Sequence, residues 1–199
     1  MRALLKFSTA VDWLNAQIGK YVIWLILAST IISGVNAVIR KTFNMSSNAY
    51  LEVQWYLFAA AFLLAAGYTL LHGEHVKIDV VSSKLSKRGQ IWVDIIGFAV
   101  FLTPVCLTIL YYGIPFFLQG YRSGEMSGNA GGLIRWPVYA MIPLGFTLLM
   151  VQGWSELIKR VAFLKGLIED PTTKKVEKTA EEELTEAIRR LAESKTNAG

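Results

Sequence analysis

The chain has 199 residues, a formal net charge of +5 and 53% hydrophobic residues, so it is more apolar and less charged than an average soluble domain. The apolar residues gather in four long blocks with the charges between them, which argues against an ordinary soluble fold. A net positive charge beside apolar blocks favours anionic lipid headgroups as partners. The sequence lacks the pattern of aromatic and basic residues that would indicate nucleic-acid binding. The single cysteine, Cys106, excludes an internal disulfide framework and fits a small buried hydrophobe.

Residues 1–20 have the pattern of an amphipathic helix. Leu4, Phe7 and Val11 begin a series of apolar residues at three- and four-residue steps, while charged and polar residues occupy the other faces. Such a helix is expected to lie in the headgroup region of a membrane. The alternative is an N-terminal extension that continues into the first span.

Four blocks have the length and apolarity of membrane-spanning helices, since about 20 apolar residues cross a bilayer core. They are residues 21–39, 49–71, 91–117 and 138–158. A secretory signal peptide is a rival interpretation of the first, because residues 35–37 faintly resemble a cleavage site, but the preceding segment is unusually long. In the second, Ala61 and Ala65 are small enough to let another helix approach closely. The third contains Pro104 and Pro115, which favour kinks.

The basic residues predict the orientation of these spans. Ten of them flank the spans on one side: Arg2, Lys6, Lys20, Lys77, Lys84, Lys87, Arg88, Lys159, Arg160 and Lys165. Four flank the other side: Arg40, Lys41, Arg122 and Arg135. The positive-inside rule therefore places both termini in the cytoplasm, and Trp and Tyr residues at the block ends fit the aromatic belts of a membrane protein.

The end of the chain differs in composition and is predicted to be a charged cytoplasmic tail. Thr179 and Glu182 have the spacing of a capping box and precede a narrow apolar stripe, which indicates a short helix. The sequence thus predicts an all-α membrane protein in three parts: an interfacial amphipathic helix (1–20), a four-helix transmembrane domain (21–160) and a tail with a short cytoplasmic helix (161–199).

Candidate sites for catalysis, cofactors or metals are sparse. His72 and His75 flank Glu74 at the inner end of the second span, but a polar helix end is favoured over a metal site because no third ligand cluster lies nearby. The glycine-rich outer loop around Gly128 lacks the Gly-Lys-Ser/Thr of a P-loop. We therefore expect a protein that is not an enzyme and has no cofactor, metal or catalytic residues.

Four acidic residues lie in or near the spans, and an ionisable group deep in lipid is a functional hypothesis by default. They are Asp12, Glu52, Asp94 and Glu156. Asp94 and Glu156 fall near predicted membrane edges, and Glu156 has Arg160 four residues later, as in a helix ion pair. For Glu52, a structural pair with the basic residues 40–41 is favoured over a role in ion coupling.

Three motifs occur in a characteristic order. Glu52-x-x-Trp55-Tyr56-Leu57-Phe58 lies in the second span, His75-Val76-Lys77-Ile78-Asp79 follows it, and Arg135-Trp136-Pro137-Val138-Tyr139 leads into the fourth span. This arrangement resembles the small permease subunits (DctQ type) of the tripartite ATP-independent periplasmic (TRAP) transporters. The resemblance covers roughly residues 20–160 and therefore all four spans.

The resemblance implies a subunit of the bacterial inner membrane that braces a large multi-span permease and helps to dock a periplasmic substrate-binding protein. It implies symport of an organic acid or similar solute, driven by an ion gradient and not by ATP. The family pattern falls on Glu52, Trp55, His75, Asp79, Trp136 and Pro137, for which we expect structural or assembly roles. Trp136-Pro137 fits an interfacial anchor followed by the first residue of a helix.

Two other functions are compatible with four spans. A membrane anchor of a redox complex would need histidines on facing helices deep in the bilayer, whereas His72 and His75 share one boundary. A stand-alone four-helix channel would need a polar stripe along one face, which the spans lack. Haem absorbance and ion conduction by the chain alone would distinguish these from a transporter subunit.

Overall fold

The computed structural model describes residues 1–45, 47–74 and 85–171, and its regular elements in these ranges are helices, with one isolated bridge between Met126 and Ile134. In chain order they are α1 (Arg2–Phe43), α2 (Asn48–Leu71), α4 (Lys87–Ile96), the π-helical segment η1 (Gly97–Leu102), α5 (Thr103–Ser123) and α6 (Trp136–Leu164). Four stretches are long and apolar enough to span a membrane: α1, α2, the continuous α4–η1–α5 helix and α6. The prediction of an all-α fold with four spanning helices is confirmed.

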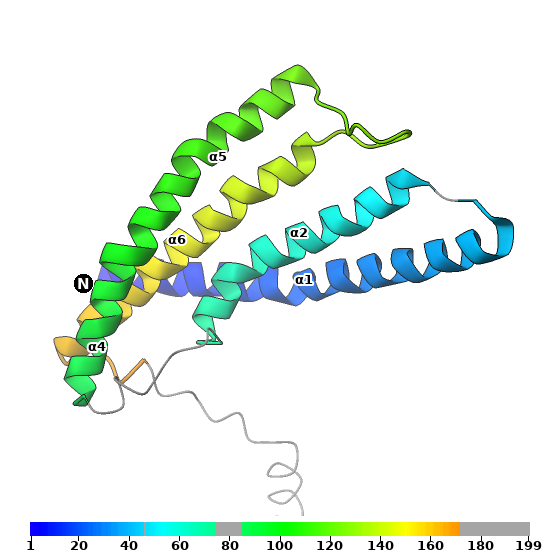
Figure 1. Cartoon of the computed structure of the whole chain (residues 1–199). Coiled ribbons are helices and arrows are strands. Elements are labelled where there is room, and N and C mark those ends of the chain that lie inside the picture. The colour runs from blue at the N-terminus through cyan, green and yellow to red at the C-terminus, as the bar shows by residue number, and fades with distance from the viewer. Residues whose placement is uncertain (46, 75–84, 172–199) are drawn as a thin grey trace, which may run out of the picture.

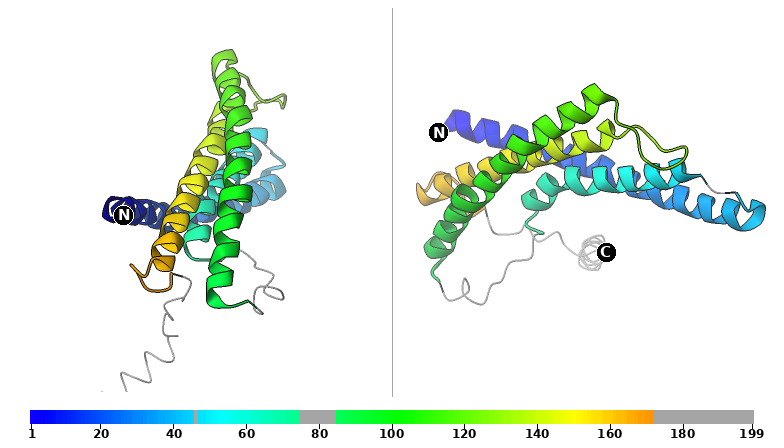
Figure 2. Two further views of the ribbon diagram at one scale, coloured as in Figure 1. Left: turned by 90° about the vertical axis from the view of Figure 1, so that its left-hand side faces the viewer. Right: turned by 45° about the horizontal axis from the view of Figure 1, so that its top comes forward.

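The helices form two hairpins, α1–α2 and α5–α6, which lie together at one end and diverge at the other (Figure 1). We call the end with the α1–α2 and α5–α6 connections the outer end, and the opposite end the inner end. Among the described helices, α2 packs between α1 and α6, and α5 packs on α6 but on neither α1 nor α2. The result is an open array in the order α1, α2, α6, α5, with α5 at one edge (Figures 1 and 2).

Helix α1 combines the predicted interfacial segment and the first span in one unbroken helix of 42 residues. At 1.5 Å per residue it is about 63 Å long, roughly twice the thickness of a bilayer core. Its first turns cross α6 and project beyond the array (Figure 2). Residues 1–20 are therefore helical as predicted, and their position in the headgroup region stays a prediction.

The third span is also longer than its apolar block, because the polar residues at both ends continue the helix from Lys87 to Ser123. Its irregular part is η1, which ends two residues before Pro104. Proline has no backbone N–H, so the turn before Pro104 loses a regular helical hydrogen bond. The carbonyl of Phe98 accepts both the backbone N–H of Thr103 and, at 2.8 Å, its hydroxyl, so the hydrogen bonding here is of the wider π-helical kind.

Helices α2 and α6 approach each other closely at glycines. A Cβ atom at Gly145 would lie 2.6 Å from the carbonyl oxygen of Leu63, which is closer than real Cβ contacts come. Ala61, expected to allow close packing, is buried, whereas Ala65 is only half-buried. Small residues thus set the distance between these two helices.

The buried apolar core is small for a chain of this length. It consists of Val11, Val22, Ala61, Ile91, Cys106, Leu110, Val138 and Ala162 within the described ranges. Large apolar side chains are instead exposed on the outer surfaces of all the long helices, for example Trp24, Phe62 and Phe101. A surface of this kind requires lipid or protein around it.

Candidate functional site

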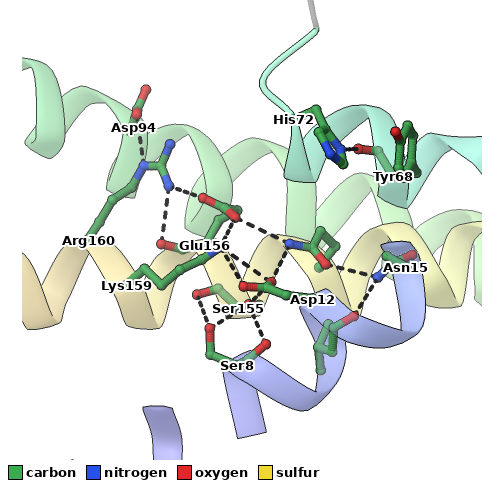
Figure 3. Close-up of polar contacts among 12 residues, drawn as sticks. Ser8, Asp12, Asn15, Tyr68, His72, Asp94, Ser155, Glu156, Lys159 and Arg160 are labelled. Atoms are coloured by element: carbon green, nitrogen blue, oxygen red, sulfur yellow. Dashed lines mark hydrogen bonds and ion pairs between the residues drawn. The ribbon is translucent and has the colours of Figure 1, made fainter. Parts of the chain in front are cut away.

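A polar cluster connects α1, α4 and α6 at the inner end of the array (Figure 3). Its members are Ser8, Asp12, Asn15, Asp94, Gln152, Ser155, Glu156, Lys159 and Arg160. Most of these side chains are buried, although the helices that carry them are candidate membrane spans. We call this group the inner cluster.

Asp12 on α1 is the acceptor on which donors from α6 converge. Gln152 Nε2 lies 2.9 Å and Ser155 Oγ 2.8 Å from Asp12 Oδ1, and Lys159 Nζ lies 3.1 Å from Asp12 Oδ2. The hydroxyls of Ser8 and Ser155 are 2.7 Å apart one turn away. Because these donors occupy successive turns of α6, they fix both the rotation and the axial position of α1 against it.

Arg160 connects α6 to the third span. It is 5% exposed, its Nε donates to Asp94 Oδ2 at 2.8 Å, and its guanidinium stacks over the ring of Phe98 in η1 at 4.7 Å. It also pairs with Glu156, which confirms the helix pair predicted from the four-residue spacing. Glu156 is shared with Lys159, so charges of both signs alternate through the inner cluster.

Asn15 brings a further helix, α2, against the inner cluster. Its Nδ2 donates to Gln152 Oε1 at 2.9 Å, and its buried Oδ1 has no hydrogen-bond donor among the described residues. That oxygen faces Gly67 of α2 so closely that a Cβ there would lie 2.2 Å from it. Glycine at this position therefore lets α2 pack directly onto the amide, with its Cα–H group toward the oxygen.

At the outer end, Glu52 near the start of α2 holds the loop between α5 and α6. The residue is 3% exposed, and its carboxylate accepts hydrogen bonds from the backbone N–H of Leu133 (2.6 Å), from Asn129 Nδ2 (2.8 Å) and from the hydroxyl of Ser127. A carboxylate with several donors is a strong local anchor. We call residues 124–135, which it organises, the outer loop.

The predicted pairing of Glu52 with the basic residues 40–41 is wrong. The described part of the chain has no ion pair between Glu52 and either of them, because donors from the outer loop already surround the carboxylate. Arg40 and Lys41 are exposed in the last turn of α1, where basic side chains interact favourably with the helix dipole. Charge alone suggested a partner, whereas backbone and amide donors supply the binding.

Further contacts fix the outer loop across the gap between the hairpins. From α2, Asn48 Nδ2 donates to the carbonyl of Ala130 (3.0 Å) and the hydroxyl of Tyr56 donates to that of Ile134 (3.1 Å). The loop thereby joins α2 to the α5–α6 hairpin where the ribbons diverge (Figure 1).

The end of the outer loop is held by Arg135, which pairs with Glu125 at 3.4 Å, while the hydroxyl of Tyr139 donates to the same carboxylate at 2.9 Å. Hydrogen bonding to Tyr139 and the nearby Glu125 carboxylate raise the pKa of Arg135 further above its usual value. The guanidinium is therefore charged at every physiological pH.

Replacing Glu52 with alanine will loosen the outer loop, because the part-buried N–H of Leu133 and the side chains of Ser127 and Asn129 lose their acceptor. The expected cost is about 1–3 kcal/mol in local stability. Hydrogen exchange of the peptide covering 124–135, measured in detergent, checks this through faster exchange in Glu52→Ala. Lys41→Ala is the matched control and should leave that peptide unchanged; equal acceleration in both variants would contradict the anchoring role.

The remaining predicted site residues lie apart from one another. Trp55 is 46% exposed and its ring meets that of Tyr56 at 4.4 Å. Trp136 is the first residue of α6 and Pro137 the second, so the predicted helix start is correct to one residue. The ring of Trp136 packs edge-on against Tyr121 at 5.5 Å. His75 and Asp79 lie outside the described residues, and the roles of these predicted residues stay predictions.

Sequence reasoning missed the residues that bring separate helices together. Asp12 was noted as acidic without a partner, and neither Lys159 nor Gln152 was singled out. Their signal is spacing on α6, where Gln152, Glu156 and Lys159 recur on one face of an otherwise apolar helix. At the outer end, Ser127 and Asn129 in a glycine-rich loop were the polar residues able to reach a buried carboxylate.

The fold defines a multi-pass membrane protein, whose polar contacts join its own helices and loops. The model of a family described as "Tripartite ATP-independent periplasmic transporters, DctQ component" matches residues 29–163. The chain belongs to this family and is a TRAP transporter small subunit. Glu52 and the outer loop lie inside the matched residues, whereas Ser8, Asp12 and Asn15 precede them. No curated protein and no solved structure gave a significant match.

Proposed function

We propose that this subunit braces the large multi-span permease of its transporter and helps to dock a periplasmic substrate-binding protein. The complex takes up an organic acid or similar solute, driven by an ion gradient. The chain lies in the bacterial inner membrane with both termini in the cytoplasm, so that the outer loop faces the periplasm. In this role the chain supplies surfaces to its partners and carries out no reaction of its own.

The observation that carries the proposal is the imbalance between a small core and a large exposed apolar surface, in a chain that belongs to a transporter family. In this open array, large apolar side chains of α1, α2, the third span and α6 are exposed and available to other transmembrane helices. The polar groups of the inner cluster are largely engaged with one another, which suits a scaffold better than a solute pathway. The anchored outer loop supports the docking role, because a fixed surface binds a soluble partner with less loss of conformational entropy.

Co-purification tests the proposal directly. The tagged full chain, expressed in its native host and extracted in mild detergent, is expected to retain a large multi-span permease in near-equal amount. Proteoliposomes with both subunits and the binding protein should then take up solute under an ion gradient, and omission of this chain should abolish uptake. A chain that emerges alone and conducts ions, or that emerges with haem absorbance, would contradict the proposal in favour of a channel or a redox anchor.

A further inference from the structure

The exposed face of α5 carries two tyrosine hydroxyls without partners. Tyr111 is 73% and Tyr112 69% exposed, and their rings meet edge-on at 5.0 Å. Within the described ranges no group of the chain accepts a hydrogen bond from either hydroxyl, because α5 packs on α6 through its opposite face, which includes Cys106 and Gly113. The pair is therefore exposed on α5, the helix at one edge of the array.

These hydroxyls lie within the apolar block predicted for the third span, residues 91–117. Tyr121, whose ring packs against Trp136, marks the aromatic belt at the outer end of α5. Tyr112 lies nine residues before it, which is about 14 Å along the helix. Side chains on a helix lean toward its N-terminus, and that direction on α5 leads toward the inner end, so the rings cannot reach the outer headgroups.

Exposed threonine hydroxyls on the spans are satisfied locally. Thr108 on the same face of α5 donates to the carbonyl of Pro104 at 2.8 Å, and Thr30 on α1 donates to Ile26 at 2.9 Å. A tyrosine hydroxyl is too far from its own backbone to do this. Lipid tails offer no acceptor, so a phenol at this depth favours a protein partner with polar groups.

The exposed face of α1 is a suitable comparison. Ile23, Ile31 and Val38 are each more than half exposed and carry no hydrogen-bonding group. Lipid tails satisfy these three side chains completely. Trp24 on the same face has an indole N–H, but it lies one turn from Tyr21 near the inner end of the predicted first span, where an aromatic belt is expected. Among the described residues, this part of α1 and the Tyr111–Tyr112 part of α5 therefore differ in chemistry.

We infer that the Tyr111–Tyr112 face of α5 is the contact surface for a transmembrane helix of the large permease subunit, which accepts hydrogen bonds from one or both hydroxyls, and that the exposed face of α1 contacts lipid. The inference rests on the proposed function and adds the location of the interface. The acceptors suited to it are backbone carbonyls at a helix break or the side chains of Ser, Asn or Gln.

Photo-cross-linking in native membranes tests the location. Two variants of the full chain are compared. The test variant is Tyr112→p-benzoylphenylalanine, and the matched control is Ile31→p-benzoylphenylalanine. The expected result is an adduct with the large permease subunit from position 112 and none from position 31. Adducts from position 31 alone, no adduct from position 112, or an adduct of twice the chain's own mass from position 112 would each overturn the inference.

A second pair of variants tests the hydroxyls themselves. Tyr111→Phe with Tyr112→Phe should lower the amount of permease retained during detergent washing about tenfold, since hydrogen bonds between membrane helices are individually modest. Tyr21→Phe with Tyr50→Phe removes two exposed hydroxyls near span ends and should leave retention unchanged. Equal behaviour of the two double variants would overturn the inference. If the unsubstituted chain itself retains no permease, the proposed function fails instead, so the two failures are distinguishable.

Discussion

Replacing Arg160 with methionine is expected to lower the free energy of unfolding by about 3–5 kcal/mol, the range for breaking a buried ion pair by removing one partner. Arg160 is 5% exposed and serves both Asp94 and Glu156. Methionine preserves most of the side-chain volume. The loss of stability therefore comes from the carboxylates of Asp94 and Glu156, which no longer have the positive charge of Arg160 beside them. In the inner cluster, this guanidinium is the group of α6 that contacts both Asp94 of α4 and Phe98 of η1.

Unfolding of the purified chain in mixed micelles, followed by tryptophan fluorescence as the SDS fraction rises, measures this change. Lys87→Ala is the control, because Lys87 pairs with Asp170 at 3.0 Å while its side chain is 52% exposed. Such exposed pairs contribute about 1 kcal/mol or less. If both variants shift the transition equally, the inner cluster does not hold the third span against α6.

Replacing Gly145 with alanine is expected to cost about 1–3 kcal/mol, as overpacking of a close contact does. The new Cβ would lie 2.6 Å from the carbonyl oxygen of Leu63 and 2.9 Å from its carbonyl carbon. These are backbone atoms that cannot rotate away, so α2 and α6 must separate. Asn15 of α1 contacts both of these helices, through Gln152 of α6 and Gly67 of α2. Separation of α2 from α6 would loosen both contacts.

Gly34→Ala is the matched control for this substitution, since a Cβ there meets nothing within 4 Å on the surface of α1. Alanine is a better helix former than glycine by up to about 1 kcal/mol, so this variant should be as stable as the unsubstituted chain or more so. The same SDS titration compares the two. A neutral Gly145→Ala variant would show that α2 and α6 are not in the close contact described.

The spanning helices were predictable because length and apolarity are properties of each segment alone. The second span, predicted at 49–71, is α2 at Asn48–Leu71. The helix start expected at Pro137 lies one residue after the observed start of α6 at Trp136, because proline is favoured in a first helical turn. The pair Glu156–Arg160 was predictable for the same reason, since its spacing lies within one helix. The predicted helix in the tail after residue 171 lies outside the described residues.

Contacts between helices were not predictable in this way, because they depend on how each helix is rotated and where it crosses its neighbour. Asp12 and Lys159 are far apart in the chain, and only the crossing of α1 over α6 brings their charges within 3.1 Å. For Glu52, nearness in sequence to residues 40–41 misled, since the outer loop folds back over α2 and supplies donors without charge. A backbone N–H is present at almost every residue, so the sequence does not indicate which one will bind a carboxylate.

The length of α1 has a consequence for how the protein meets bilayers of different thickness. A helix of about 63 Å can adapt to a thin or thick membrane by changing its tilt, if nothing else holds it. Here Asp12 attaches α1 to α6 near the inner end. Near the outer end, the outer loop attaches α2 to the α5–α6 hairpin, and α2 packs along α1. The angle is therefore set by the protein, and a mismatch in thickness must be absorbed by the surrounding lipid, which will thin or thicken locally against the subunit.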